Sequence, residues 1–320
     1  MTNPEPRTVG EAGEFGLISH VTRRLSLPPA VSVGPGDDGA VFLINGSAVT
    51  SVDLLVEGVH FRRDWSSAAD IGRKAVAVNI ADIEAMGAEP VALVIGVGMP
   101  SDLEFSWVKE MVTGVRAEAE SAHVALVGGD MVNARDITIS VTVIGETAGR
   151  SPVLRSGARA GQVVAIRGRL GWAAAGLAAL GRGFRSPRAA VDAQRVPQVP
   201  YGAGLEAAEA GATAMIDISD GLLADLAHVA LASGVSFHLD SARFTIGEPV
   251  RTVAAAINTD PLGFVLTGGE DHALAATFDA GQVPEHWDVV GLVAPAAETP
   301  EVLVDGQAWQ GESGWTHFRH

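Results

Sequence analysis

The sequence has 320 residues, of which 47% are hydrophobic, and its 38 acidic against 22 basic residues give a net charge of −16. A chain of this length favours two domains over one, and its negative charge disfavours nucleic acid and anionic membranes as partners. The absence of cysteine excludes disulfides, thiolate metal sites and a cysteine nucleophile.

Neither a targeting segment nor a membrane span is evident in the sequence. The N-terminal stretch MTNPEPRTVGEAGEF has no basic region followed by an apolar run. The longest apolar runs, such as VALVIGVGM, are far shorter than the roughly 18 residues that a membrane helix needs. We therefore expect a cytoplasmic protein.

Helices and strands are mixed in the first half of the chain. Apolar periodicity and turn signals predict, in chain order, a helix at 15–25, strands at 40–44 and 48–56 around the turn Asn45-Gly46, a helix from Ser66 or Ser67 to Met86 followed by Gly87, a strand at 91–99, a helix at 102–121, and strands at 123–130 and 136–146. On the helix ending near Met86, Asp82 continues the apolar stripe of Ile71, Ala75 and Val78. A buried acid at that position needs a partner.

A segment rich in Gly, Ser and Arg after Glu146 places a domain boundary near residue 148, which divides the chain into 1–148 and 149–320. Beyond it we expect a strand at 162–168, a helix at 172–180, a proline-rich connection, a helix at 202–210, a strand at 213–218, a helix from Ser219 or Asp220 to Gly234, and strands at 236–240, 263–271, 272–278 and 287–293. Because strands and helices do not alternate strictly, the fold class is two α+β domains.

The segment GPGDDG at 34–39 has the spacing of a dinucleotide-binding loop, but two carboxylates occupy it and a strand follows, so we reject that reading. Adjacent acids in a glycine turn are tolerated when they are solvated or when a cation lies between them. A solvated acidic turn therefore remains the alternative at Asp37 and Asp38. The only lysines, Lys74 and Lys109, follow no phosphate-binding loop, so any ATP phosphates would be held mainly by metal ions and arginine.

Three further acidic motifs follow apolar strands or lie on an apolar helix: AVNIADIEAMGA, LVGGDMV and MIDISDGLLADL. The last resembles the start of a calcium loop but lacks its remaining ligands. A strand-to-helix corner carrying Asp217, Ser219 and Asp220 suits Mg²⁺, with the hydroxyl and helix-start amides free for phosphate oxygens. Simple capping by Ser219 or Asp220 is the alternative. Together the acidic motifs predict the walls of one metal-filled site.

Single residues in these motifs also have structural interpretations. Gly129-Asp130 and the run Thr267–Asp271 could each be an ordinary turn after a strand. His60 could be structural and Arg155 only solvated. Trp315, in GESGWTHF, could pack on the surface as part of a C-terminal segment.

The motifs together resemble one family, the thiamine-monophosphate kinases of the PurM-like (aminoimidazole-ribonucleotide-synthetase-like) superfamily. The matching stretches are GEFGLI (13–18), GPGDDGAVF (34–42), SVDLLVEGVHF (51–61), KAVAVNIADIEAMGAEP (74–90), LVGGD (126–130), LRSGARAG (154–161), IDISDGLLADLAHV (216–229) and LTGGEDHAL (266–274). They occur in the family's order and cover most of the chain.

The resemblance implies an ATP-dependent, Mg²⁺-assisted kinase that phosphorylates thiamine monophosphate to thiamine diphosphate. It also implies a two-domain PurM-like fold, with an N-terminal domain that binds ATP and metal and whose sheet pairs with that of a second subunit into a barrel, and a C-terminal α+β domain. A homodimer is expected on this ground alone. No covalent nucleophile is expected, because the acceptor is already a phosphate anion.

By position, the resemblance assigns several Mg²⁺ ions to Asp38, Ser51, Val52, Asp53, Asp82, Asp130, Asp217 and Asp220. The family usually has Thr or Ser where this chain has Val52, so a metal contact there would use the backbone carbonyl. ATP would contact Gly129, Asp130, Arg155 and Ser219, and thiamine monophosphate would contact His60, Glu270 and Trp315. The family's GGEDYEL is GGEDHAL here, which leaves the role of His272 open.

Two other functions compete with this one. Aminoimidazole ribonucleotide synthetase, in the same superfamily, uses ATP to close a ring. A non-catalytic protein that binds divalent metal is a different class, and it would form no ADP with thiamine monophosphate. Selenophosphate synthetase and the hydrogenase-maturation relative depend on a reactive Cys or Sec, which this chain lacks.

Overall fold

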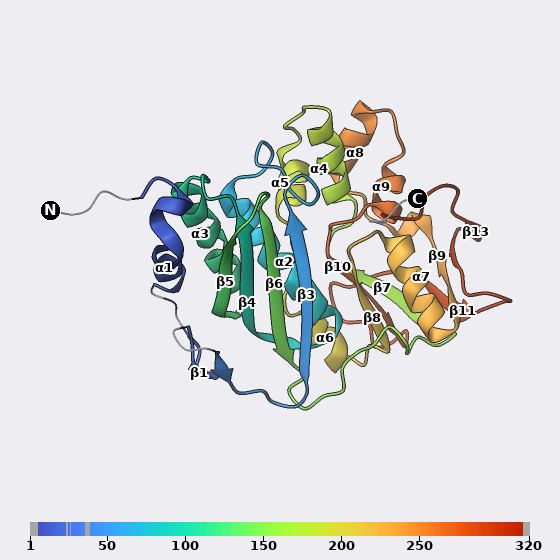
Figure 1. Ribbon diagram of the computed structural model, residues 1–320. Coiled ribbons are helices and arrows are strands. Elements are labelled where there is room, and N and C mark those ends of the chain that lie inside the picture. The colour runs from blue at the N-terminus through green and yellow to red at the C-terminus, as the bar shows by residue number, and fades with distance from the viewer. Residues whose placement is uncertain (1–5, 24, 26, 36–38, 316–320) are drawn as a thin grey trace. The chain divides into compact units, whose positions relative to one another are not determined.

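The computed structural model describes residues 6–23, 25, 27–35 and 39–315. The chain divides into two compact units (Figure 1). The first comprises Met1–Ile83 and Pro90–Gly149, and the second comprises Glu84–Glu89 and Arg150–His320. Each unit is described by itself below.

The first unit is built on a four-stranded sheet of order β3-β6-β4-β5. Its elements are α1 (Val9–Thr22), β1 (Val31–Val33), β2 (Val41–Phe42), β3 (Ala48–Val56), α2 (Ala68–Ala85), β4 (Glu89–Met99), α3 (Phe105–Ser121), β5 (Ala125–Asn133) and β6 (Thr138–Glu146). The two strands expected around Asn45-Gly46 are present as β2 and β3. They do not pair with each other, because β2 pairs with β1 and β3 pairs with β6.

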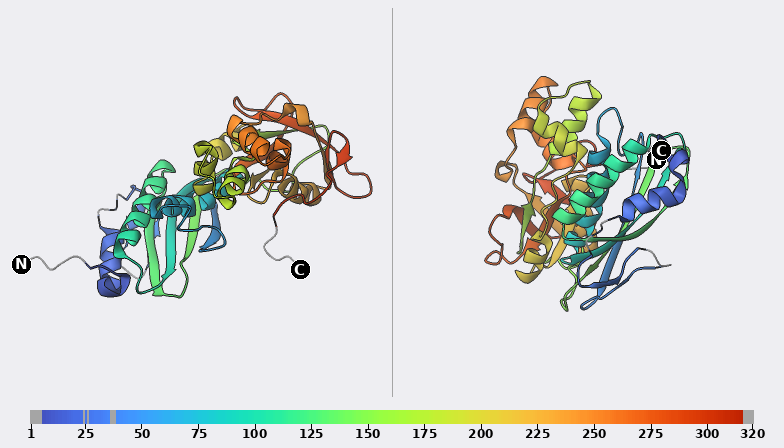
Figure 2. Two further views of the ribbon diagram at one scale, coloured as in Figure 1. Left: turned by 90° about the horizontal axis from the view of Figure 1, so that it is seen from above. Right: turned by 90° about the vertical axis from the view of Figure 1, so that its left-hand side faces the viewer.

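One face of this sheet is covered and the other is open. Helices α2 and α3 lie behind the sheet in Figure 1, and the two views of Figure 2 show the same layering. On β6, Ile139, Val141 and Val143 are buried, as the predicted alternation requires. On the open face, Val52 and Leu54 of β3 remain 58% and 50% exposed. The open face therefore presents apolar side chains that nothing in the described part of this unit covers.

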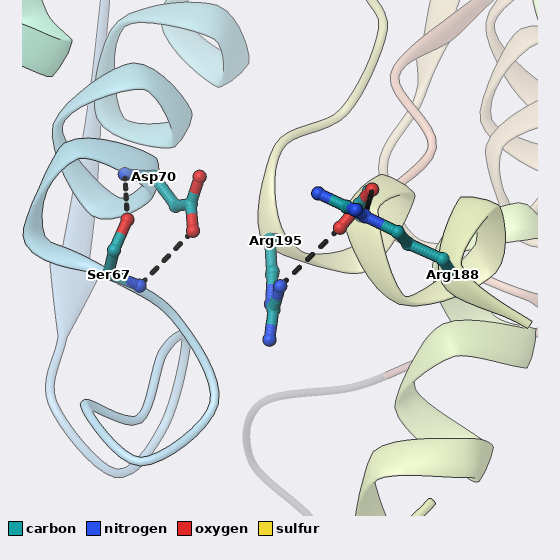
Figure 3. Close-up of polar contacts among 5 residues, drawn as sticks. Ser67, Asp70, Arg188 and Arg195 are labelled. Carbon is teal, nitrogen blue, oxygen red and sulfur yellow. Dashed lines mark hydrogen bonds and ion pairs between the residues drawn. The ribbon is translucent and has the colours of Figure 1, made fainter. Parts of the chain in front are cut away.

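Helix α2 begins and ends as its sequence predicts. The Ser67 hydroxyl accepts from the Asp70 amide at 3.1 Å, and the Asp70 carboxylate accepts from the Ser67 amide at 3.1 Å (Figure 3). This reciprocal pair satisfies two amide donors at the helix start. After the last turn, Gly87 adopts φ 65°, the left-handed conformation that ends many helices. Both ends of the helix that carries Asp82 are thus fixed locally.

The second unit contains a seven-stranded sheet of order β13-β12-β9-β11-β7-β10-β8. Its elements are β7 (Val163–Arg167), α4 (Trp172–Gly181), α5 (Arg188–Arg195), α6 (Ala203–Glu209), β8 (Ala214–Ile218), α7 (Leu222–Ser233), β9 (Val235–Leu239), η1 (Ser241–Arg243), α8 (Glu248–Ala256), α9 (Pro261–Thr267), β10 (Ala273–Phe278), β11 (Asp288–Pro295), β12 (Val302–Val304) and β13 (Gln307–Ala308).

Both faces of this sheet are buried, and β7 contributes to each. Val164 and Ile166 pack into a core with α7, while Val163 and Ala165 pack into a second core with α6. A strand buried on both faces reads as a continuous apolar run, which explains the sequence QVVAIRG. The strands expected at 162–168, 213–218, 236–240, 272–278 and 287–293 are confirmed as β7, β8, β9, β10 and β11.

The strand expected at 263–271 is wrong, because the structure has helix α9 there. The Asp260 carboxylate accepts from the Leu262 amide at 2.9 Å, and Pro261 occupies the first helical position. Asp followed by Pro is a helix-start signal, and it outweighs the short apolar run that we read as a strand. The proline-rich connection also contains helix α5, whose Asp192 pairs with Arg188 and Arg195 on its surface (Figure 3).

Candidate active site

In the first unit, β3 and α2 bring predicted metal ligands together. Ser51 and Asp53 are two residues apart on β3 and so lie on one face of the strand. The Ser51 hydroxyl donates to the Asp82 carboxylate at 2.5 Å, and the Asp53 amide donates to the Asn79 side chain at 2.8 Å. Asn79 and Asp82 are three residues apart on α2, so they occupy the same side of the helix. Asp82 has the partner that its place on the apolar stripe required.

His60 is held by its backbone and by Lys74. Its Nδ1 accepts from the Val56 amide at 3.1 Å, and the Lys74 ammonium donates to the His60 carbonyl at 3.1 Å. Since Nδ1 accepts a hydrogen bond in this arrangement, the neutral ring carries its proton on Nε2. In this tautomer Nε2 is the hydrogen-bond donor of the ring. The importance of Lys74 and Asn79 was missed, although Asn79 lies in the NIAD motif that contains Asp82.

Asp130 lies on the other edge of the same sheet. β3 and β5 are the two edge strands, so three strand spacings, roughly 14 Å, separate Asp130 from Asp53. Asp130 is exposed, and its carboxylate accepts from the Met131 amide at 2.8 Å. At Gly129 an added Cβ would collide with the carbonyl of Ile95, so β5 approaches β4 closely there. Within one chain, the structure does not bring Asp130 to Ser51, Asp53 and Asp82.

The structure assigns no ligand side chain to the site from two other predicted positions, for different reasons. Asp38 lies outside the described residues. Val52 points to the open face of the sheet, and its apolar side chain has no ligand atom. Any contribution from Val52 would use its carbonyl, as the sequence indicated.

In the second unit, β8 leads into α7 through the segment Asp217–Gly221, called here the β8–α7 corner. The carboxylate of Asp225 accepts from the amides of Asp220 and Gly221 at 3.1 and 3.0 Å. Burial raises the pKa of Asp225 to about 7, and the nearby charge of Asp217 adds to the rise. Asp225 thus holds the shape of the corner from the first turn of α7. Neither Ser219 nor Asp220 caps this helix with its side chain, so the capping alternative is wrong.

The structure answers the open question about His272. Its Nδ1 lies 3.1 Å from a carboxylate oxygen of Asp217, and both side chains are buried. The ring therefore orients Asp217 at the end of β8. His272 directly precedes β10, the neighbour of β8 in the sheet, since β10 begins at Ala273, which pairs with Ile218.

Backbone hydrogen bonds hold the loop Gly268–His272 against the β8–α7 corner. The Glu270 amide donates to the Ser219 carbonyl at 2.7 Å, and the His272 amide donates to the Ile218 carbonyl at 2.9 Å. Glu270 and His272 adopt φ 65° and 51°, which is costly for residues other than glycine and is concentrated at functional sites. An added Cβ at Gly269 would lie 2.5 Å from the Ser219 carbonyl oxygen. Only glycine fits there without a shift, so the run is not an ordinary turn.

Asp271 anchors this loop to a second helix. Its carboxylate accepts from the amides of Gly171 and Ala173 at 2.5 and 2.8 Å, at the start of α4. Burial raises the pKa of Asp271 to about 7, although both of these hydrogen bonds oppose the rise. The sequence analysis included Asp271 in the run Thr267–Asp271 but gave it no role of its own. A signal was present, because a helix start without a side-chain cap, as at Gly171, needs an acceptor from elsewhere.

A third segment reaches the same corner. The Trp315 amide donates to the Asp220 carbonyl at 2.9 Å, and an added Cβ at Gly314 would collide with Ala224. The Trp315 side chain is 53% exposed, which excludes a core role. Asp217–Gly221, Gly268–His272 and Gly314-Trp315 are far apart in sequence, yet the structure gathers them at one end of α7.

Arg155 lies at the other end of α7. Its carbonyl accepts from the hydroxyl of Ser233, the last residue of that helix, at 2.8 Å. A helix of this length separates the Arg155 backbone from the β8–α7 corner by roughly 16 Å. The structure therefore does not bring the backbone of Arg155 to Ser219, and its exposed side chain is the only part that could reach toward a shared ligand.

The oxygen donors of both units fit Mg²⁺ by their chemistry. Carboxylate and hydroxyl oxygens are the ligands of hard divalent cations. Among the described residues, no group of three or more acidic or histidine side chains is already assembled around a metal position. Mg²⁺ does not require one, because it usually binds through one or two carboxylates together with waters and substrate phosphates. Pairs such as Ser51 and Asp82 are sufficient for that mode.

Comparison with known proteins first defines the class. Residues 36–147 match the family described as AIR synthase related protein, N-terminal domain, and residues 159–299 match its C-terminal domain. The E. coli hydrogenase maturation protein HypE shares the fold, with a TM-score of 0.71 at 16% identity. The chain is thus a two-domain α+β protein of the PurM-like superfamily.

More similar proteins then define the family. The chain is 47% identical over 316 residues to the thiamine-monophosphate kinase of Mycobacterium tuberculosis. The matched region covers 98% of this chain and 94% of that protein. The chain is 38% identical to the enzyme of Corynebacterium glutamicum, covering 97% and 95%. The solved structure of AaThiL complexed with AMPPCP and TMP covers 99% of this chain and all of its own, at 31% identity and a TM-score of 0.80. The chain belongs to the thiamine-monophosphate kinase family.

Proposed function

We propose that this protein transfers the γ-phosphoryl group of ATP to the phosphate of thiamine monophosphate, which yields thiamine diphosphate and ADP. The similarity at 47% identity over almost the whole chain carries this proposal. The relative AaThiL has been crystallised with AMPPCP, an ATP analogue, and TMP. The β8–α7 corner and the Ser51–Asp82 pair supply the acidic and donor groups that this chemistry requires.

Several Mg²⁺ ions would be held by Asp38, Ser51, the carbonyl of Val52, Asp53, Asp82, Asp130, Asp217 and Asp220. When bound, Mg²⁺ would neutralise the negative charge that develops on the transferring phosphoryl group. In the second unit, His272 fixes the orientation of Asp217, and Asp225 fixes the backbone of Asp220. These two residues would act as positioning residues.

The two substrates would be bound by different sets of side chains. ATP would contact Gly129, Asp130, Arg155 and Ser219. Thiamine monophosphate would contact His60, Glu270 and Trp315. The His60 ring would donate from Nε2 to a phosphate oxygen, because its Nδ1 already accepts from Val56.

Transfer would be direct, without a covalent intermediate on the protein. The acceptor oxygen belongs to a phosphate that is already an anion, so no strong general base is required. The chain's own residues would contribute by holding the two phosphate groups in line and by shielding them from water.

We further propose a homodimer in which the first unit's sheet joins that of a second copy into a closed barrel, with the first domain, 1–148, binding ATP and metal and the second, 149–320, forming the α+β domain. The open face with Val52 and Leu54 supports this. Closing two such sheets can join edge strand β3 of one copy to edge strand β5 of the other. That junction would place β5, the strand that carries Asp130, beside β3 of the other copy, the strand that carries Asp53.

No helix in the described residues combines the length and apolar character that crossing a membrane requires. We propose that the protein works in the cytoplasm, without nucleic acid or membrane partners. The net charge of −16 supports this, because it repels polyanionic surfaces.

A direct assay tests the proposed reaction. The purified protein is incubated with ATP, thiamine monophosphate and Mg²⁺, and thiamine diphosphate and ADP are followed by chromatography. Equal amounts of both products are expected. ADP formation that does not depend on thiamine monophosphate, or no turnover at all, would contradict the proposal.

A further inference from the structure

The second unit contains a hollow of about 190 Å³ that is separate from the candidate active site. It is lined by the end of β7, the segment before α4, and the segment between η1 and α8. No residue proposed to bind metal, ATP or thiamine monophosphate lines it. Sites for larger cofactors and substrates usually measure roughly 300–1,000 Å³, so this hollow suits a small ligand.

The decisive feature of the hollow is the guanidinium of Arg169. It lies 4.3 Å from the centroid of the Trp172 ring and is partly buried. Burial lowers the pKa of Arg169, and the charge of Asp271 only opposes that shift. Asp271 itself accepts from the amides of Gly171 and Ala173. Among the described residues, no oxygen acceptor is hydrogen-bonded to the Arg169 guanidinium.

The charges around the rest of the hollow are nearly balanced, and Arg169 is the exception. Arg243 lies on another wall, and its Nε donates to Asp240 at 3.1 Å. Asp288 is the acidic side chain among the lining residues, and Asp240 is ion-paired with Arg243, so among the described lining residues Arg169 is the cation without an ion-paired carboxylate. The hydroxyl of Thr245 adds a neutral donor. The Arg169 guanidinium is partly buried, and an anionic ligand would give its donors a charged acceptor in place of water.

The cation–π contact with Trp172 holds the Arg169 guanidinium at the wall of the hollow. A guanidinium held in this way presents its N–H groups as a fork, which matches two oxygen atoms of a carboxylate or phosphate. We infer that this hollow is a binding site for a small oxyanion, either phosphate or a carboxylate, held by Arg169 with Arg243 and Thr245 beside it.

The inference is tested on the full-length protein labelled with 5-fluorotryptophan, in EDTA and without nucleotide, so that no metal ion can recruit anions elsewhere. The chain has six tryptophans, and Trp172→Phe assigns the ¹⁹F signal of Trp172. Inorganic phosphate, acetate and chloride are titrated separately. A saturable shift of the Trp172 signal with phosphate, with acetate, or with both is expected, and the pattern identifies which oxyanion the site prefers.

Arg169→Gln should weaken this binding at least about tenfold, since a charge-assisted bidentate contact is lost. Arg182→Gln is the matched control, because Arg182 lies at the far end of α4 and does not line the hollow. It should bind like the unchanged protein. Arg169→Lys, which keeps the charge but not the fork, should also weaken binding, and it replaces Arg169→Gln if that variant does not fold. An equal response to chloride, no saturable shift, or unchanged binding in the Arg169 variants would each overturn the inference.

Discussion

At the scale of single residues, Asp53 and Asp130 are the carboxylates whose removal is most informative. Each would neutralise a metal ion bound to phosphate, and each is partly or fully exposed, so Asn should leave the fold intact. Asp53→Asn or Asp130→Asn should lower kcat roughly a hundredfold or more. Turnover is measured at saturating Mg²⁺ with circular dichroism as the folding control. Unchanged turnover in both variants would reject the metal-site assignment.

Trp315 offers a test of the thiamine end of the site. The thiazolium ring of the substrate is cationic and aromatic, and an indole face attracts such a cation by about 0.5–2 kcal/mol. Trp315→Ala keeps the backbone bond to Asp220 and should raise the KM for thiamine monophosphate by roughly 2- to 30-fold. Trp315→Phe should restore much of the loss.

The KM for ATP is the control for the Trp315 variants, and it should change little. A wild-type KM for thiamine monophosphate in Trp315→Ala would remove the residue from the site. Equal losses for both substrates would indicate misfolding.

At the scale of elements, the close approach between the Gly268–His272 loop and the β8–α7 corner is the most constrained feature. Gly269→Ala would place a methyl group 2.5 Å from the Ser219 carbonyl oxygen. Displacing the loop should cost about 1–3 kcal/mol and move Glu270, so the KM for thiamine monophosphate should rise. Gly263→Ala on α9 is the matched control, because an added Cβ there meets nothing within 4 Å. Equal KM values in both variants would contradict the proposed role of the loop.

Asp271 predicts how stability depends on pH. Its pKa is raised from 3.8 to about 7 in the folded state, because burial disfavours the charged carboxylate. Between these values the folded state binds more protons than the unfolded state, so the free energy of unfolding should fall as pH rises from about 4 to about 7. Asp271→Asn should make this fall shallower, as urea unfolding at several pH values would show. A slope that is unchanged in the variant would assign the pH dependence to other groups.

The elements that could be predicted from sequence are those with local signals. The capping pair Ser67 and Asp70, the left-handed Gly87 and the alternation of β6 all depend on neighbours in the chain. The apolar run of helix α9 is too short to show helical periodicity, so it predicted a strand. The helix-start signal Asp260-Pro261 did not enter that prediction. The pairing of β3 with β6 rather than β2 depends on partners almost a hundred residues away, which no local pattern encodes.

The residues of the candidate site also divide into those with a local sequence signal and those without one. The acidic motifs marked Asp82, Asp217 and Asp220 because each sits beside an apolar element. Asp225 and Asn79 were missed, since their roles are hydrogen bonds to the backbone of other segments. The separation of Asp53 and Asp130 on opposite edges of a sheet could not be foreseen without the strand order.

At the scale of the whole molecule, the open face of the first unit predicts a homodimer. Light scattering at micromolar concentration should give twice the chain mass of 32.9 kDa. Leu54→Glu places a charge on the apolar face and should yield a monomer with little activity. A wild-type protein that scatters as a monomer would count against the dimer.

A mixture of two inactive variants tests whether the copies share a site. If Asp53 of one copy works with Asp130 of the other, a heterodimer of Asp53→Asn and Asp130→Asn chains contains one intact site. Co-expression at equal levels should then restore about a quarter of wild-type activity, because half of the dimers are mixed and each has one working site of two. If each chain is self-sufficient, the mixture should stay inactive.

The placement of Asp53 and Asp130 on opposite edges of one sheet affects how enzyme activity should depend on the concentration of the protein. If a complete metal site needs both edges, a lone chain has none, and below the dissociation constant the number of sites grows with the square of the chain concentration. Specific activity should then fall on dilution and recover on concentration, with no change in any residue. The rate of thiamine diphosphate synthesis in the cell would then depend on whether the concentration of the protein exceeds the dissociation constant of the dimer.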